Sequence, residues 1–418
     1  MSLLTRLPRD VIYEILKFVR IKHSTEYVNP DKYLVDCLAL SNLSKTCKEF
    51  RDLVQPELFR SLLVRGTLNS SLNLIKVLTD RPDLANAVQC VSSDETNFQN
   101  IEPCKLKPLS AKDATRRKRP DIGYEDAVTL AILLCRNIRN VKLYHTDQAF
   151  SYFATPGFPF ANLKELHLYA HSSNDSRALE GSLGWFFKAA PALQNIRAEA
   201  VWKVEPGLFS HPTLAELALH YSCIDVKALG DIMAAFPKLR RFLYRADTAP
   251  YHIFDLKDVT PREVVDGLLP VKDTLTRLCL EFQYAEAWEH DLWTEEDTTL
   301  QGISQLNNLT ELELGCYGLA YPGTIQEADG RIRPETKIEW LVRRLALPSL
   351  EQLKLWDIGE VSDLANIAEI LPELFPSLEK FETKADEDDM ADEVVKGLPE
   401  LFAKHGITLE FFNHDDDD

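Results

Sequence analysis

The chain has 418 residues, of which 45% are hydrophobic and 27% are charged, so it can bury a large core and is unlike a disordered protein. Its formal net charge of −18 makes nucleic acid an unsuitable partner for the chain as a whole. Charges interrupt every apolar run before it reaches the roughly 20 residues that a membrane-spanning helix needs.

The first residues and the cysteines indicate the cellular compartment. The first ten residues lack the uninterrupted apolar stretch of a secretory signal. Eight cysteines, none of them in a Cys-x-x-Cys pair, favour reduced thiols over a disulfide framework in a chain of this length. We therefore expect a protein of the cytoplasm, the nucleus or both, with no membrane as its partner.

The chain begins with apolar residues at helical spacing. Over residues 7–19 they recur at intervals of 3, 4 and 7, which places them on one face of an amphipathic helix. A second series before Pro56 predicts one or two further helices, and residues 20–37 between the two series are predicted to form a loop. The apolar positions are Leu7, Val11, Ile12, Ile15, Leu16 and Val19, then Leu38, Leu40, Leu43, Cys47, Phe50, Leu53 and Val54.

Residues 92–123 combine polar side chains, three prolines and a basic cluster, and predict a long insert. Between residues 105 and 119, seven lysines and arginines stand against the single acidic residue Asp113, a net charge of +6. The run Arg116-Arg-Lys-Arg-Pro120 is similar to a short nuclear-import signal, and a solvated loop explains it equally well.

Beyond residue 56 the sequence repeats the phrase Leu-x-x-Leu-x-Leu after short helix-like segments. Successive copies are separated by 21 to 41 residues, so insertions enlarge several repeats. A proline precedes five copies, and it separates helix from strand because it cannot continue a helix. Clear copies begin at Leu163, Leu214, Leu275, Leu309 and Leu350, and weaker ones begin at Ile138, Leu193, Leu239 and Leu378.

The repeats predict an α/β fold built as an irregular leucine-rich-repeat solenoid. Alternation within each phrase points the leucines inward, and parallel strands line the concave side. Helices, such as those expected over 226–236 and 362–375, cover the convex side. We expect a helical domain over residues 1–56, the solenoid over 57–412 with its insert at about 92–123, and an acidic tail over 413–418.

The side chains between the inward leucines are the candidates for binding a protein, because parallel strands display them together. Tyrosine, tryptophan and arginine are the residue types that most often anchor interfaces. Any solvated strand face also carries polar side chains, which is the simpler explanation for each residue. The candidates are Tyr144, His167, Tyr169, Arg197, His220, Arg245 and Trp356, with Lys142, Glu281, Glu313 and Lys354 on the same face.

Two tryptophans, Trp288 and Trp293, lie in the acidic segment 284–297. They are predicted either to pack as a lid on the solenoid or to form an exposed anchor for a basic ligand.

No pattern indicates catalysis. The sequence has no phosphate loop, no Gly-x-Ser-x-Gly elbow and no His-Glu-x-x-His motif. His167 and His171 are predicted to be surface side chains rather than metal ligands, and Cys223, Cys279 and Cys316 to be small packing residues. We expect neither an enzyme nor a metal or cofactor site.

The helical segment resembles the F-box found at the start of fungal F-box proteins. The resemblance rests on the spacing of its apolar residues and on the phrase Thr46-Cys-Lys-Glu-Phe-Arg-Asp-Leu-Val54, followed by the leucine-rich repeats. One departure is the 18-residue stretch from Arg20 to Cys37, which is longer than the usual link between F-box helices. The order of the two parts is similar to that of leucine-rich-repeat F-box adaptors.

The resemblance implies a substrate receptor of a Skp-cullin-F-box ubiquitin ligase. The F-box would dock on the Skp adaptor, and through it on a cullin, while the repeats would hold an unknown protein substrate. Alternatively, the helices only cap the solenoid, and the chain is a non-ligase scaffold or acidic protein-binding module. The implied Skp-adaptor contacts are Leu7, Pro8, Val11, Ile12, Ile15, Leu16, Leu40, Leu43 and Phe50.

Overall fold

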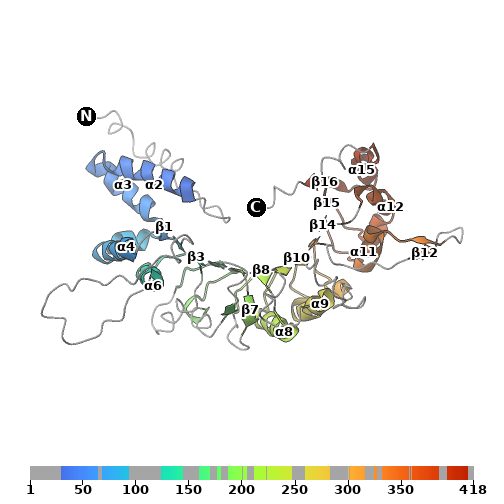
Figure 1. The fold of residues 1–418 in the computed structure, drawn as a ribbon, viewed down its shortest axis with the longest axis horizontal. Coiled ribbons are helices and arrows are strands. Elements are labelled where there is room, and N and C mark those ends of the chain that lie inside the picture. Colours follow the sequence, from blue (N-terminus) through green and yellow to red (C-terminus); the bar gives the residue numbers. More distant parts are fainter. Residues whose placement is uncertain are drawn as a thin grey trace. The chain divides into compact units, whose positions relative to one another are not determined.

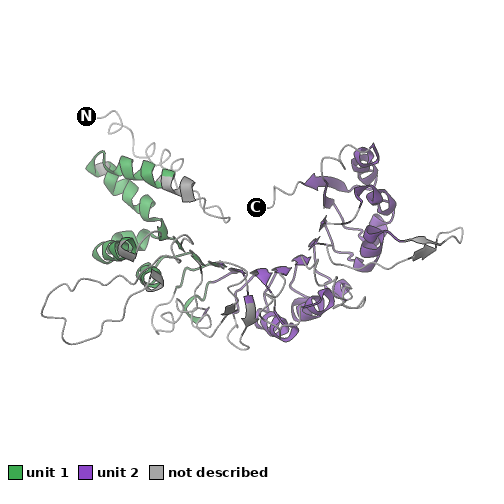
Figure 2. Cartoon of the chain, viewed as in Figure 1, with its two compact units in different colours: residues 1–168, 188–192 green, residues 169–187, 193–418 purple. Residues whose placement is uncertain are grey.

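The computed structural model divides the chain into two compact units, residues 1–168 with 188–192 and residues 169–187 with 193–418 (Figure 2). The described residues are 30–64, 68–93, 124–144, 160–169, 177–179, 187–199, 201–204, 211–222, 224–246, 259–282, 300, 302–315, 324–326, 332–356, 358, 360–385 and 393–412. The predicted helix over 7–19, almost all of the basic insert, and the tail over 413–418 lie outside them.

Unit 1 contains a helical pair, α2 (Pro30–Ser44) and α3 (Lys48–Phe59) (Figure 1). Leu40 of α2 is enclosed with Phe50, Leu53 and Val54 of α3 in one apolar cluster. The predicted loop over 20–37 is wrong in its second half, because Pro30 is tolerated in the first turn of a helix and no breaker follows it. The helix α3 also continues past Pro56, since Leu58 packs against the cluster.

The rest of unit 1 begins the repeats. Its strands pair in parallel, β1 with β2 and β2 with β3, and the buried residues Leu62, Val91 and Val141 lie side by side. The strand β2 occupies the first two residues assigned to the basic insert. The elements are β1 (Ser61–Val64), α4 (Leu68–Asp80), α5 (Pro82–Ala87), β2 (Cys90–Ser93), α6 (Tyr124–Leu134), β3 (Asn140–Tyr144) and β4 (Glu165–Tyr169).

Unit 2 carries a parallel sheet whose strand order follows the chain. The order is β6 (Asn195–Glu199), β8 (Glu216–Ser222), β9 (Arg241–Ala246), β10 (Arg277–Phe282), β11 (Glu311–Gly315), β14 (Gln352–Trp356), β15 (Lys380–Lys384) and β16 (Thr408–Phe412). Two small pairs accompany it: β5 (Arg177–Leu179) with β7 (Val201–Val204), in parallel, and β12 (Thr324–Gln326) with β13 (Ile332–Pro334), antiparallel.

The helices of unit 2 lie on one side of this sheet (Figure 1). The predicted helix over 226–236 is confirmed as α8. The one predicted over 362–375 is broken into three short pieces, because turns intervene at 368–370 and Pro372 opens the last piece. The elements are α8 (Val226–Ala235), α9 (Pro261–Leu268), η4 (Leu269–Val271), η5 (Ile303–Gln305), α11 (Lys337–Leu345), η6 (Val361–Asp363), α12 (Leu364–Ile367), α13 (Leu371–Leu374) and α15 (Glu393–Ala403).

The inward direction of the repeat leucines is confirmed, since Leu217, Leu219, Leu312 and Leu314 are all buried. A ladder of backbone hydrogen bonds at the strand starts fixes how one repeat stacks on the next. The amides of Arg240 and Arg241, for example, both donate to the carbonyl of Ala215, at 2.8 and 3.0 Å. The same two-donor contact recurs along the sheet, so the chain is an α/β repeat solenoid.

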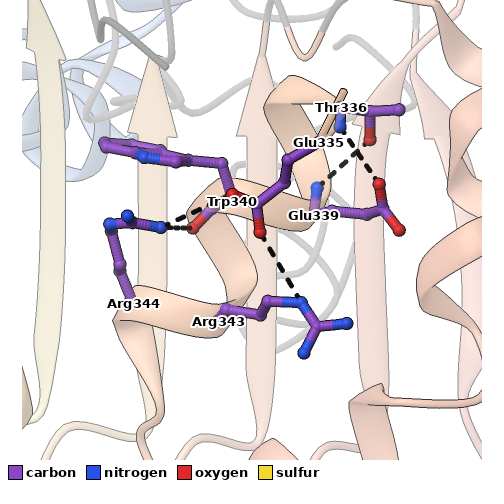
Figure 3. A network of polar contacts seen from close by, with 6 residues as sticks. All are labelled: Glu335, Thr336, Glu339, Trp340, Arg343 and Arg344. Atoms are coloured by element: carbon purple, nitrogen blue, oxygen red, sulfur yellow. Dashed lines mark hydrogen bonds and ion pairs between the residues drawn. The ribbon is translucent and has the colours of Figure 1, made fainter. Parts of the chain in front are cut away.

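The helix α11 shows how contacts between residues close in the sequence secure a helix of unit 2 (Figure 3). The Thr336 hydroxyl accepts from the Glu339 amide, and the Glu339 carboxylate accepts from the Thr336 amide, which forms a capping box. The buried carboxylate of Glu335 lies 3.6 Å from Nε of Arg343, and Arg344 lies 4.5 Å above the ring of Trp340. These contacts secure both ends of a helix whose apolar face is buried.

Candidate protein-binding surface

The face of the unit 2 sheet opposite its helices, here called the helix-free face, presents three rows of side chains. The middle row lies in register across the sheet and combines charged with apolar residues. Its members, from β6 to β16, are Arg197, Ala218, Leu243, Cys279, Glu313, Lys354, Glu382 and Glu410. The alternation that places these residues outward is the same that places the leucines inward.

Ion pairs between neighbouring strands cover much of this face. Arg245 Nε lies 2.9 Å from Glu281 Oε2, Arg277 pairs with Glu311, and Lys354 Nζ lies 3.4 Å from Glu313 Oε1. Lys380 lies 2.8 Å from Glu382 on its own strand and 2.8 Å from Glu410 on β16, and the hydrogen bonds to these two carboxylates raise the pKa of Lys380. Such pairs add little stability each, because they are partly solvated, but they fix side-chain positions.

An aromatic cluster lies at the C-terminal ends of the later strands. The ring of Trp356 meets the ring of Phe412 edge-on, with 6.4 Å between centroids. The Nζ of Lys354 lies 4.9 Å from the first centroid and 4.3 Å from the second, which is cation–π geometry. From three strands away, Arg245 reaches within 5.9 Å of the Trp356 centroid.

Gly315 makes the contact between Arg245 and Trp356 possible. It lies in register between Glu281 of β10 and Trp356 of β14. A Cβ atom at this position would lie 2.9 Å from Cγ of Glu281, so any larger residue would displace that side chain. Because Gly315 has no side chain, the space above it is open, and Arg245 and Trp356 meet there.

The His220 side chain lies at an irregularity of β8. The register to β9 shifts between Leu219 and Ser222, and Tyr221 has a φ of 49°. Burial, followed by the charges of Arg245 and Arg197, lowers the pKa of His220 to about 3. The imidazole is therefore neutral near pH 7, and it lies in a positive environment.

The predicted binding residues differ in accessibility. Arg197 and Arg245 are half-buried on the helix-free face, as expected. Four other candidates are largely buried: the exposed fraction is 6% for His167 and Tyr169, 9% for His220 and 7% for Trp356. Neighbouring strands are only about 4.8 Å apart, so side chains on adjacent strands cover one another. The prediction that His167 is a surface side chain is thus wrong. The strand β3 includes Tyr144, whose side chain is outside the described part, as are His171, Trp288 and Trp293.

Sequence reasoning missed Leu243 and Arg241. In the copy Leu239-Arg-Arg-Phe-Leu-Tyr244 an apolar residue occupies the outward position between two inward aromatic residues. That signal is visible in the sequence, because the clear copies of the repeat carry a small or polar residue at this position, namely His167, Ala218, Cys279, Glu313 or Lys354. A pocket of about 90 Å³ extends from Arg241 across the strands that follow β9 and is bordered by Arg277, Cys279, Glu313 and Lys354.

The residues assigned to Skp-adaptor contact fall into two groups. Leu40 and Phe50 have exposed fractions of 0% and 4% and hold α2 against α3, and Leu43 packs against them. On another face of α2, Val35 and Leu38 are 65% and 60% exposed. The residues from Leu7 to Leu16 are outside the described residues, so the structure does not place them.

No known protein family and no curated protein matches the chain. A solved structure of a protein from Bacteroides fragilis is 15% identical, with a TM-score of 0.28, over 55% of this chain and 67% of that one. The structure of a TLR13–ssRNA13 complex is 13% identical, with a TM-score of 0.31, over 66% of this chain and 36% of that one. At such TM-scores, neither similarity bears on function.

None of the helices among the described residues is long and apolar enough to cross a membrane. No group of three or more histidine, cysteine or acidic side chains in this part of the chain is arranged to hold a metal ion.

Proposed function

We propose that the chain is a substrate adaptor of a Skp-cullin-F-box ubiquitin ligase. The F-box-like helices dock on the Skp adaptor, and the helix-free face of unit 2 holds the substrate protein. The adaptor contributes proximity rather than chemistry, since it raises the concentration of the substrate beside a charged ubiquitin-conjugating enzyme. Support comes from the sequence resemblance and from the repeat solenoid that follows the helices.

The observation that carries the docking role is the apolar face of α2. Val35 and Leu38 are one helical turn apart and are 65% and 60% exposed, although Leu40 between α2 and α3 is fully enclosed. Exposed apolar side chains grouped on one face are typical of a surface that another protein covers. Burying two such side chains contributes on the order of 1.5 to 3 kcal/mol each.

Co-expression with the Skp adaptor of the same organism tests the proposal. We expect a stoichiometric complex that Leu38→Asp and the double variant Leu7→Ala, Pro8→Ala weaken. Val394→Asp is the matched control, because Val394 is an apolar residue that is 51% exposed on α15, a helix of unit 2. If the folded parent chain does not bind the Skp adaptor at micromolar concentration, the ligase proposal fails.

A scaffold without a ligase has its own support. The helix α3 contacts α5 and β1, so the helical pair also covers the first repeat, as the cap of a repeat array does. Removal of residues 1–59 separates the two roles. A pure cap predicts an insoluble or destabilised remainder, whereas docking predicts a remainder that has lost only the Skp adaptor.

A further inference from the structure

The helix-free face has an apolar strip among its charged residues. Ala218, Leu243 and Cys279 are register neighbours on β8, β9 and β10, in the middle row. Ala218 and Leu243 are half-buried, so part of each remains accessible. An apolar side chain of a partner can pack on this accessible leucine, with the charged side chains forming a rim around the contact. In protein interfaces, the residues at such a desolvated centre contribute most of the binding free energy.

Two arginines flank this strip. Arg197 is the register neighbour of Ala218 on β6, and Arg241 lies two residues before Leu243, on the same face of β9. Within the part of the chain that the structure describes, neither guanidinium has a carboxylate at ion-pair distance. By contrast, Arg245, Arg277, Lys354 and Lys380 each pair with a glutamate.

We propose that Arg197, Leu243 and Arg241 bind an acidic segment of the partner protein, in which carboxylate side chains flank one apolar residue. The apolar residue lies on Leu243 and Ala218, and the carboxylates pair with the two arginines. Planar guanidinium groups suit carboxylates because they donate two parallel hydrogen bonds. The inference rests on the proposed function only in identifying this partner as the ligase substrate.

The distribution of charge along the chain allows an acidic ligand at this position. Residues 281–418 hold 33 acidic and 10 basic residues, a net charge of −23, so residues 1–280 carry 32 acidic and 37 basic residues, a net charge of +5, to which residues 105–119 contribute +6. The acidic region begins at Glu281 on β10, the strand beside β9. The nearest carboxylates of that region, those of Glu281, Glu311 and Glu313, each pair with a cation, so their charges are largely compensated on this face.

One carboxylate competes with the ligand. Glu216 is the register neighbour of Arg241 on β8, although the two side chains form no ion pair in the described structure. An arriving carboxylate must therefore approach Arg241 against the charge of Glu216. Removing that charge without changing the shape, as Glu216→Gln does, strengthens binding of an acidic peptide and weakens binding of a basic one.

The test uses the purified full chain and a short fluorescein-labelled peptide with glutamates on both sides of a single leucine. One control peptide replaces the glutamates by lysines, and a second replaces the leucine by serine. Fluorescence anisotropy is expected to show that the parent peptide binds at least about tenfold more tightly than either control, because the lysine control loses both charge-assisted contacts and the serine control loses the apolar one.

Four variants locate the site. Arg197→Gln and Arg241→Gln each weaken binding of the glutamate peptide about tenfold, and Glu216→Gln tightens it severalfold, which a folding defect cannot mimic. Lys384→Gln is the matched control, because Lys384 is a half-buried cation at the far end of the same face and leaves the affinity unchanged. Melting temperatures verify that each variant is folded.

Equal binding of the glutamate and lysine peptides overturns the inference, as does a glutamate peptide that Arg241→Gln and Glu216→Gln leave unaffected. The assay contains no Skp adaptor, so its failure is independent of the ligase proposal. A chain that binds the peptide but not the Skp adaptor retains this site and loses the ligase function. A chain that binds the Skp adaptor but not the peptide retains the ligase function and binds its substrate at another site.

Discussion

At the scale of single residues, the enclosed imidazole of His220 makes stability depend on pH. Its pKa is about 3 in the folded chain, whereas an unfolded histidine has a pKa near 6.5. At acidic pH the unfolded state therefore binds a proton at this imidazole that the folded state does not bind. The free energy of unfolding decreases as the pH falls through the pKa of the unfolded state. The contribution amounts to about 2 kcal/mol lost between about pH 7 and pH 5.

Urea unfolding of the parent and of His220→Gln at the two pH values measures this contribution. The variant is expected to lose about 2 kcal/mol less than the parent on acidification. His405→Gln serves as the control substitution, because it makes the same change at a histidine that is exposed. Equal pH dependence of the parent and His220→Gln would mean that the folded chain accepts the proton at this ring.

Residues also show the limit of sequence reasoning about the binding surface. Strict alternation correctly placed Arg197 and Arg245 outward, because the direction of a side chain depends only on its own strand. It did not predict that His220 and Trp356 would be enclosed, since their exposure depends on neighbours from other repeats. The meeting of Arg245 and Trp356 over Gly315 joins residues 111 positions apart, which no single repeat contains.

At the scale of elements, the helices of unit 2 begin with local signals. Both α9 and α11 start with a capping box of the pattern Thr-x-x-Glu, at Thr260 and Thr336. We expect Thr336→Ala to cost about 1 kcal/mol, because one amide of the first turn loses its acceptor. Thermal unfolding of Thr336→Ala and Thr336→Ser tests this, and the serine variant should retain most of the stability. A serine variant as unstable as alanine would place the effect in packing rather than in the cap.

The strands were predicted from the sequence more accurately than the helices. The clear copies of Leu-x-x-Leu-x-Leu predicted β4, β8, β10, β11 and β14, because period-two alternation acts within a few residues, and a proline precedes two of these copies. The helix expected over 362–375 breaks into short pieces, since stacking against α11 and α15 determines its path and the local pattern does not contain those contacts. Likewise, the apolar periodicity of α2 is weak, and the contacts that hold this helix come from Leu40 packing on Phe50, Leu53 and Val54 of α3.

At the scale of the whole molecule, a repeat solenoid distributes its stability along the chain. Each repeat of unit 2 contacts mainly its neighbours, so the stability of one region depends on the repeat beside it. The last repeat is the most vulnerable because β16 has a neighbour on one side only, namely β15. The ring of Phe402 from α15 packs edge-on against Phe381 of β15 at 5.5 Å and is fully buried.

Phe402→Ala tests this arrangement. Removing a buried phenylalanine costs about 3 to 5 kcal/mol, and in a linear array that loss is expected to stay local. Hydrogen exchange followed by mass spectrometry should show faster exchange in β15 and β16, with β8 and β9 protected as in the parent. Leu217→Ala, placed among the middle strands, is the counterpart that should increase exchange in β6 to β9 first. Uniform loss of protection in Phe402→Ala would instead mean that unit 2 unfolds as one cooperative body, in which case its terminal repeat would be as stable as its centre.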